Sequence, residues 1–172
     1  MADNLDIIKC PACENEMQKV YMPEQGVNID VCTHGCGGIY FDNREFKQFD
    51  EAHENIDKIL EVIEGKKFAQ TDEAKTRLCP VCGAPMVKNY SSYKQEIQID
   101  ECYTCGGKFL DNKELIKFRA EYATEAERSE DMIASVYSTV GIEIRNLEIK
   151  NELNRMRRSP LKRLFDSLIY KN

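Results

Sequence analysis

The sequence predicts a small α+β fold held together by metal ions. In this fold, two short antiparallel β units are each followed by an α-helix, and a long helix ends the chain. Three observations favour this class. Eight cysteines stand in two sets of four, the two sets belong to an internal repeat, and the 172-residue chain is only 42% hydrophobic and has no Trp. That apolar content is low for a large single core, and modules of about 40 residues generally need a metal or disulfides to stay folded.

Each cysteine set consists of two close pairs. The first set is Cys10, Cys13, Cys32 and Cys36, and the second is Cys79, Cys82, Cys102 and Cys105. Two such pairs separated by about 15–20 residues are typical of a tetrahedral zinc site. Four thiolates suit Zn²⁺ and leave no coordination position open for catalysis. We therefore predict two Zn²⁺ ions per chain, each contributing on the order of 10 kcal/mol to folding.

The redox state of the cellular compartment decides whether these cysteines bind metal or form disulfides. Residues 1–6 include two aspartates and no basic start, so a secretory signal is not expected. No apolar stretch approaches the roughly 18 residues of a membrane span. We expect a cytoplasmic protein without membrane contact, in which thiols stay reduced and bind metal. A rubredoxin-like iron site uses the same four thiolates and stays open as an alternative.

The repeat defines the elements of each unit. Cys79 repeats Cys10, and Gly106-Gly107 repeats Gly37-Gly38 at the same spacing along the chain. Alternating apolar residues over 27–31 predict a half-buried strand. The turn at 23–26 joins it to a strand over 17–22, and residues 97–99 repeat the alternation. Third strands are expected at 39–41 and 108–110.

The first predicted helix runs from about residue 43 to 64 and stops at Gly65, a natural residue to follow a helix end. Asp42 and Glu45 form a variant of the capping box, which Asp111 and Glu114 repeat. The acidic face of this helix is expected to be solvated surface. Residues 66–77 are polar and are expected to be a linker.

The C-terminal part of the chain is predicted to be helical. A second helix starts near Asn112, and the pattern resumes from about 131 to 158, before Pro160. One apolar stripe comprises Ile133, Tyr137, Val140, Ile144 and Leu147, and a second, rotated stripe comprises Ile142, Ile149, Leu153 and Met156. A wide apolar face needs a partner, either the first long helix or a second chain in a homodimer. The expected ranges are 1–65, 66–77, 78–128 and 129–172.

A family resemblance rests on the order of these motifs. Cys-Pro-x-Cys is followed by Met four residues on, then by Cys-x-x-Cys-Gly-Gly, two apolar residues, Asp and Glu-Leu. Residues 79–118 match this order closely, and residues 10–49 nearly as well. The order resembles the bacterial zinc-finger family that is similar to the zinc ribbon of transcription factor IIB. The resemblance implies two tandem zinc ribbons with four cysteine ligands each, and implies little about activity.

The first unit departs from the pattern twice. Three residues, not two, separate Cys32 from Cys36, and Glu14 replaces the glycine found at Gly83. We expect a strained or more exposed first site, with Cys36 as its least secure ligand. His34, inside the widened turn, is expected to be exposed rather than a ligand. His53 is expected to pack at the boundary of the first helix.

Charge and the lack of catalytic motifs limit the function. The net charge is −6; residues 151–172 hold six bases and two acids, which leaves −10 on residues 1–150. The charge of −10 on residues 1–150 argues against nucleic-acid binding through bulk electrostatic attraction. No phosphate loop or catalytic metal motif occurs in the sequence, so we expect no enzyme. The remaining basic candidates for contact with a polyanion are Arg155, Arg157, Arg158, Lys162 and Arg163.

The sequence thus predicts a structural zinc protein that acts as an interaction module. Its partner is expected to be a protein or a second copy bound through the C-terminal helix. Exposed hairpin side chains such as Tyr21, Tyr90, Tyr93 and Lys94 are further candidates for contact. Nucleic acid in a transcription-related setting is the weaker expectation. Iron–thiolate redox chemistry, and zinc sensing or delivery through the imperfect first site, remain alternatives.

Overall fold

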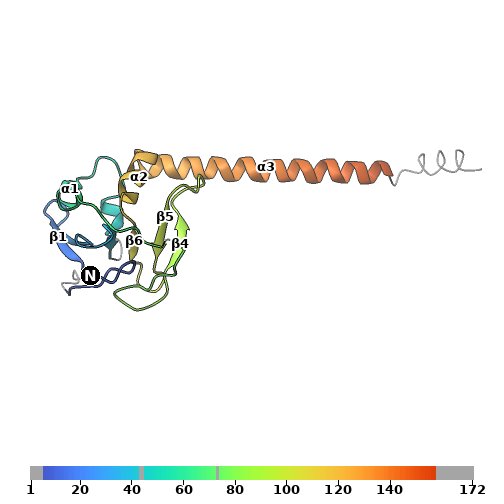
Figure 1. The fold of residues 1–172 in the computed structure, drawn as a ribbon. Coiled ribbons are helices and arrows are strands. Elements are labelled where there is room, and N and C mark those ends of the chain that lie inside the picture. Colours follow the sequence, from blue (N-terminus) through green and yellow to red (C-terminus); the bar gives the residue numbers. More distant parts are fainter. Residues whose placement is uncertain (1–5, 43–44, 73, 158–172) are drawn as a thin grey trace, which may run out of the picture. The chain divides into compact units, whose positions relative to one another are not determined.

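The computed structural model describes residues 6–42, 45–72 and 74–157. The chain divides into two compact units on either side of the Ser129–Glu130 bond. The first unit contains a six-stranded antiparallel sheet with the strand order β1-β2-β3-β6-β5-β4 (Figure 1). The strands are β1 (Gln18–Met22), β2 (Val27–Val31), β3 (Ile39–Phe41), β4 (Val87–Tyr90), β5 (Gln98–Glu101) and β6 (Lys108–Leu110).

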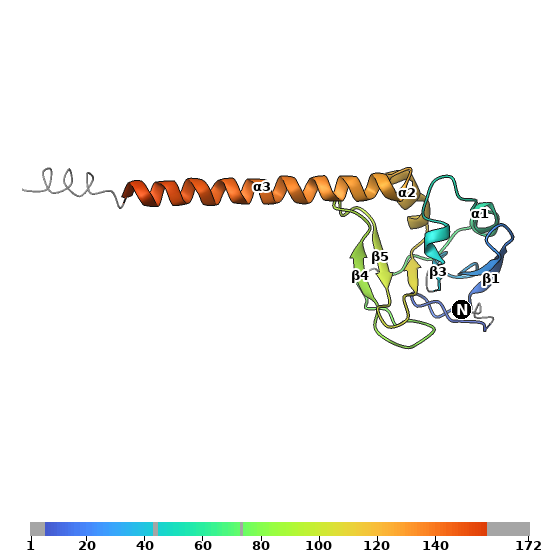
Figure 2. The same ribbon diagram turned by 180° about the vertical axis from the view of Figure 1, so that it is seen from behind.

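The two repeats are joined at the centre of this sheet. Strand β3 of the first repeat pairs with β6 of the second, and Tyr40 lies opposite Phe109 in the register. These two residues occupy the same position of the repeat, because Phe109 follows Tyr40 at the same spacing that separates Cys79 from Cys10. The pair therefore lies on a pseudo-two-fold axis that relates the two ribbons. Figure 2 shows the strands following one another across the sheet from β4 to β1.

Alternation along β3 separates two buried clusters. Ile39 and Phe41 belong to the larger apolar cluster, while Tyr40 between them belongs to the cluster that contains the buried cysteines. Successive side chains of a strand point to opposite faces, so the apolar core and the cysteines lie on opposite sides of this strand. The core also includes side chains from α1 (Asp57–Ile63) and α2 (Glu114–Glu121).

The prediction of one helix over 43–64 is wrong. Over the described residues 45–64, the structure has a 3-10 turn, η1 (Phe46–Gln48), and then the short helix α1. Between them, Arg119 of α2 donates hydrogen bonds to the backbone carbonyls of Phe49 at 2.6 Å and Ala52 at 3.1 Å. A third goes to the carbonyl of Glu54 at 2.5 Å. These bonds satisfy carbonyls that a continuous helix would pair internally.

The predicted end of this segment is confirmed. Helix α1 ends at Ile63, and Gly65 follows with a φ of +71°, the left-handed conformation that favours glycine. The hydrogen bond to the glutamate carboxylate is present in each predicted capping box. The Glu45 carboxylate accepts a hydrogen bond from the backbone N–H of Asp42 at 2.8 Å, and Glu114 accepts one from Asp111 at 2.6 Å.

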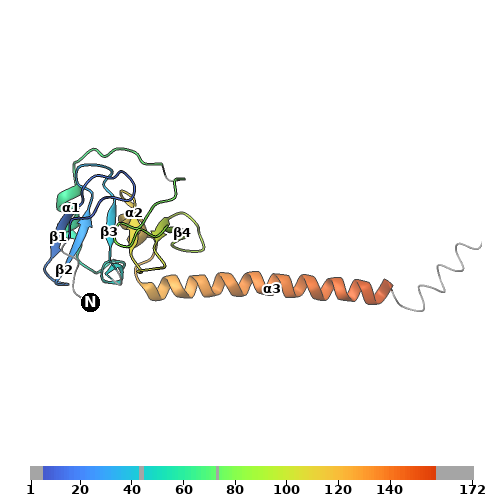
Figure 3. The ribbon, with the colours of Figure 1, turned by 90° about the horizontal axis from the view of Figure 1, so that it is seen from below.

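The long helix α3 (Glu125–Arg157) begins earlier than the predicted 131. Its first turn belongs to the first unit, where the Arg128 guanidinium lies 3.7 Å from the centre of the Phe118 ring and is buried. Figure 3 shows α3 as one uninterrupted helix. From Glu130 onward it lies in the second unit, where exposed large apolar side chains recur along its length.

Candidate metal centres

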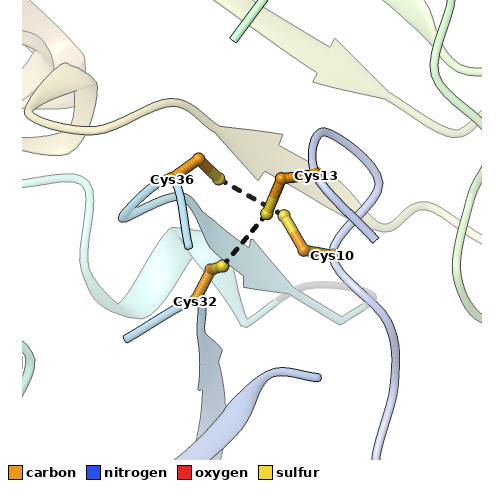
Figure 4. A group of neighbouring side chains, drawn as sticks. All are labelled: Cys10, Cys13, Cys32 and Cys36. Carbon is orange, nitrogen blue, oxygen red and sulfur yellow. Dashed lines mark hydrogen bonds between the residues drawn. The ribbon is translucent and has the colours of Figure 1, made fainter. Parts of the chain in front are cut away.

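The first cysteine set converges from two turns. Cys10 and Cys13 lie in the turn before β1, and Cys32 and Cys36 lie in the turn that follows β2 (Figure 4). The backbone N–H of Glu14 donates to the carbonyl of Cys10 at 2.9 Å and closes the first turn. The N–H of Gly37 donates to the carbonyl of Cys32 at 3.1 Å and closes the second. Both turns therefore aim their sulfur atoms at one point.

The sulfur geometry of this set fits a tetrahedral metal ion. The Sγ atoms of Cys10 and Cys36 lie 3.4 Å apart, as do those of Cys13 and Cys32. All four sulfurs lie within 4.8 Å of one another. A regular tetrahedron with Zn–S bonds of about 2.3 Å has edges of about 3.8 Å, which falls inside this range. The 3.4 Å separations are too long for disulfide bonds, and all eight cysteines are free thiols.

The second set repeats this arrangement. The sulfurs of Cys79 and Cys105 lie 3.5 Å apart, and those of Cys82 and Cys102 lie 3.4 Å apart. The N–H of Gly83 donates to the carbonyl of Cys79 at 2.9 Å, just as Glu14 does in the first turn. The two sets therefore share one backbone design.

Electrostatics favour a cation at each site. Hydrogen bonds with Cys32 and Cys36, followed by burial, raise the pKa of Cys10 far above its ordinary value. In the second set, burial raises the pKa of Cys105 to about 12. Four close sulfurs therefore do not all ionise on their own. A divalent cation removes this obstacle, because it stabilises the thiolates as ligands and releases their protons.

A family comparison identifies the metal as zinc. A family model described as "Transcription factor zinc-finger" matches residues 9–51 and again residues 78–120, which together make up half of the chain. The chain belongs to this transcription factor zinc-finger family. No curated protein matches the chain, and no solved structure matches it.

The family assignment and the two cysteine sets together define a structural zinc-binding module with two Zn²⁺ ions. The predicted tandem zinc ribbons are confirmed, because the two family matches coincide with the two cysteine sets. Within the described residues, no helix is both long enough and apolar enough to cross a membrane.

Strain at the first zinc ribbon is confirmed, but greater exposure is not. Glu14 has a φ of +65°, close to the +73° of Gly83, so a side chain occupies a backbone conformation suited to glycine. The expectation of a more exposed first site is wrong. Cys10, Cys32 and Cys36 are all buried, whereas Cys82 of the second ribbon is exposed.

The segment after α1 explains the burial of the first site. The backbone N–H of Ala69 donates to the carbonyl of Gly35 at 3.1 Å. The Phe68 ring lies so close to Gly37 that an added Cβ atom would come within 2.7 Å of it. The predicted linker thus covers the widened turn of the first ribbon. Cys36 joins the other three ligands despite the extra residue before it.

The two histidines lie outside the metal sites. His34 is exposed in the widened turn, as predicted, and its Nδ1 atom lies 2.9 Å from the Thr33 hydroxyl. The prediction for His53 is wrong. Its side chain is 74% exposed, because no helix forms at this position, and it lies 3.2 Å from the Glu51 carboxylate.

Arg77, which the sequence motifs did not single out, fixes the second ribbon. Its guanidinium is buried and donates to Asp100 at 2.6 Å and to Asp111 at 2.9 and 2.8 Å. Burial lowers the pKa of Arg77, but the ion pairs with Asp111 and Asp100 outweigh it and raise the pKa overall. The repeat could have indicated that Arg77 is buried. Arg77 occupies the position that Ile8 holds in the first unit, and Ile8 is also buried.

The predicted basic residues lie apart from the zinc sites in the sequence. Arg155 is exposed on α3, and Arg157 is the last residue of that helix. Arg158, Lys162 and Arg163 lie outside the described residues.

Proposed function

We propose that the protein is a non-enzymatic interaction module in which the zinc ribbons form a rigid base and helix α3 binds a second copy of the chain. The single observation that carries the proposal is the exposed apolar surface of α3. Its exposed large apolar residues are Met132, Ile133, Val136, Tyr137, Val140, Ile142, Ile144, Leu147, Ile149 and Leu153. Helices in water draw most of their stability from packing of an apolar face.

The spacing of one stripe on α3 fits pairing with a like helix. Ile133, Tyr137, Val140, Ile144 and Leu147 recur at alternating intervals of four and three residues. This is the spacing of the apolar seam of a coiled coil. Asn151 continues the same spacing, and a polar residue on such a seam limits the number of chains and the register.

Charges beside this stripe favour an antiparallel pair. Glu143 and Lys150 flank the seam at equivalent heptad positions. In an antiparallel dimer, such positions face each other across the seam, so Glu143 of one copy can meet Lys150 of the other. In a parallel dimer, Glu143 would face Glu148 and Lys150 would face Arg155, which repel.

Sedimentation of the full-length zinc-loaded chain tests the proposal. We expect a species of twice the 19.9 kDa chain mass that dissociates on dilution. Leu147→Asp, on the seam, is expected to give a monomer. Ile149→Asp is the matched control, because Ile149 is similarly exposed but lies on the rotated stripe. A wild-type monomer at high concentration would contradict self-association.

The absence of catalysis is part of the proposal. Each zinc ion has four cysteine ligands available, which leaves no position for an activated water or a substrate. Burial of Cys10, Cys32 and Cys36 also weakens the alternative of zinc delivery through the first site. An absorption spectrum separates zinc from the iron alternative, because zinc–thiolate sites are colourless.

Nucleic-acid binding in a transcription setting is the second candidate. The family description and the basic end of the chain favour it, whereas the −10 charge of residues 1–150 opposes it. Binding to a labelled DNA duplex that weakens steeply with added salt would support this candidate. No binding at low salt would remove it.

A further inference from the structure

One side chain of the first ribbon reaches the metal site of the second. Tyr40 lies in β3 and is completely buried. Its hydroxyl oxygen lies 3.3 Å from the Sγ atom of Cys79 and 3.9 Å from that of Cys105. Gly107 makes room for it, because a Cβ atom at that position would collide with the Tyr40 hydroxyl.

The chemistry of this contact is that of a donor to a zinc ligand. A phenolic hydroxyl keeps its proton at neutral pH and can donate it in a hydrogen bond, and a zinc-bound thiolate carries negative charge. Among the described residues, the Tyr40 hydroxyl has hydrogen-bond partners only in these two sulfurs. A buried hydroxyl without a partner would be costly, so the contact satisfies both groups.

The repeat supplies an internal comparison. Phe109 occupies the position of Tyr40 in the second ribbon, and its ring packs against Gly38 of the first. It has no hydroxyl to offer the first site. That site receives a hydrogen bond of another kind, from the Asn15 side-chain amide to the Cys13 sulfur at 3.3 Å, in an exposed position. The two sites therefore differ in their surroundings although their ligands are alike.

We infer that Tyr40 is a positioning residue for the second zinc ion. Its hydroxyl donates to the Cys79 thiolate, orients that ligand and lowers its effective charge. Retention of zinc in the second ribbon thereby depends on the first. Loss of a group that supports a metal ligand typically costs about 10- to 100-fold in metal affinity, and the 3.3 Å contact to one sulfur places the expected effect near the lower figure.

The test uses Tyr40→Phe in the full-length zinc-loaded protein. This change removes only the hydroxyl and installs the residue that the repeat already has at 109. Tyr21→Phe is the matched control, because Tyr21 lies on β1 and is 58% exposed. Zinc is withdrawn with a chelator while freed thiols are alkylated, and peptide mass spectrometry reports which cysteine set reacts.

We expect about 10-fold faster alkylation of the set of Cys79, Cys82, Cys102 and Cys105 in Tyr40→Phe, with a smaller increase for the first set. A Co²⁺-substituted sample adds a readout that packing alone does not move. Loss of the O–H···S bond should shift the thiolate-to-cobalt charge-transfer band of one site. Equal acceleration of both sets, or an unchanged rate with an unchanged band, would overturn the inference.

Discussion

Tyr40 pairs with Phe109 across the β3–β6 junction, and the two residues occupy the same position of the internal repeat. Each aromatic ring crosses to the other ribbon, Tyr40 toward Gly107 and Phe109 toward Gly38. The exchange places side chains of each ribbon against the glycine pair that follows the other ribbon's cysteines. The two zinc ribbons are therefore halves of one sheet, and the stability of one should depend on the metal of the other.

Loss of one ligand should expose this dependence. Cys102→Ser leaves three thiolates at the second site, so we expect no more than one zinc ion per chain and a large fall in the melting temperature. Because β6 supports β3, the cysteines of the first set should also become more reactive toward alkylating reagents. Metal analysis and mapping of alkylated peptides measure both effects.

Thr104→Ser is the control for Cys102→Ser, because Thr104 is exposed in the same turn and is not one of the four clustered cysteines. A Cys102→Ser protein with two zinc ions and an unchanged melting temperature would contradict the ligand assignment. A first set that stays protected after the second zinc is lost would instead show that the ribbons are independent.

Removal of Arg77 should be strongly destabilising. Arg77→Met retains much of the side-chain volume but removes the guanidinium that pairs with Asp100 and Asp111 in a buried site. Breaking a buried ion pair by removing one member costs about 3–5 kcal/mol. Denaturant unfolding of the zinc-loaded protein measures this loss.

Lys58→Met provides the comparison for Arg77→Met. The Lys58–Glu61 pair is 51% and 60% exposed, and pairs of this kind contribute less than about 1 kcal/mol. If both variants lose equally little stability, the Arg77 network does not hold the second ribbon.

Backbone strain in the first turn should be removable. Glu14 has a positive φ that costs a non-glycine residue about 1–2 kcal/mol, so Glu14→Gly is expected to raise the melting temperature. Gly83→Ala makes the reverse change at the same place in the second ribbon. An added Cβ at Gly83 has no atom within 4 Å, so its expected cost is purely conformational. Opposite shifts in the two variants support the argument, and shifts of the same sign count against it.

The metal sites could be predicted from the sequence because their information is local. Each close pair of cysteines, with the glycine that follows three of the four pairs, encodes its own backbone shape, and the recurrence of these features in the second half of the repeat identifies both sites. The C-terminal helix could be predicted for the same reason, because the spacing of its apolar residues lies within one segment of the chain. These features require no knowledge of what else the chain contacts.

The joined sheet and the broken first helix could not be predicted in this way. Strands β3 and β6 are three residues each, and neither sequence indicates that the two strands pair with each other. The segment after η1 has helical apolar spacing, yet Arg119, 70 residues beyond Phe49, binds its carbonyls. Tertiary hydrogen bonds overrode the local pattern. His53 was misplaced for the same reason, because its predicted burial assumed a helix that does not form.

Charge reversal on α3 should reveal the direction of the proposed helix pair. In an antiparallel dimer, Glu143→Lys places the new lysine side chain against Lys150 of the other copy, so we expect weaker association by sedimentation. In a parallel dimer the same change would relieve repulsion between Glu143 and Glu148 and strengthen association. The double variant Glu143→Lys/Lys150→Glu restores opposite charges in the antiparallel arrangement and should recover the wild-type dissociation constant. Tighter association of the single variant would therefore exclude the antiparallel pair while leaving self-association itself intact.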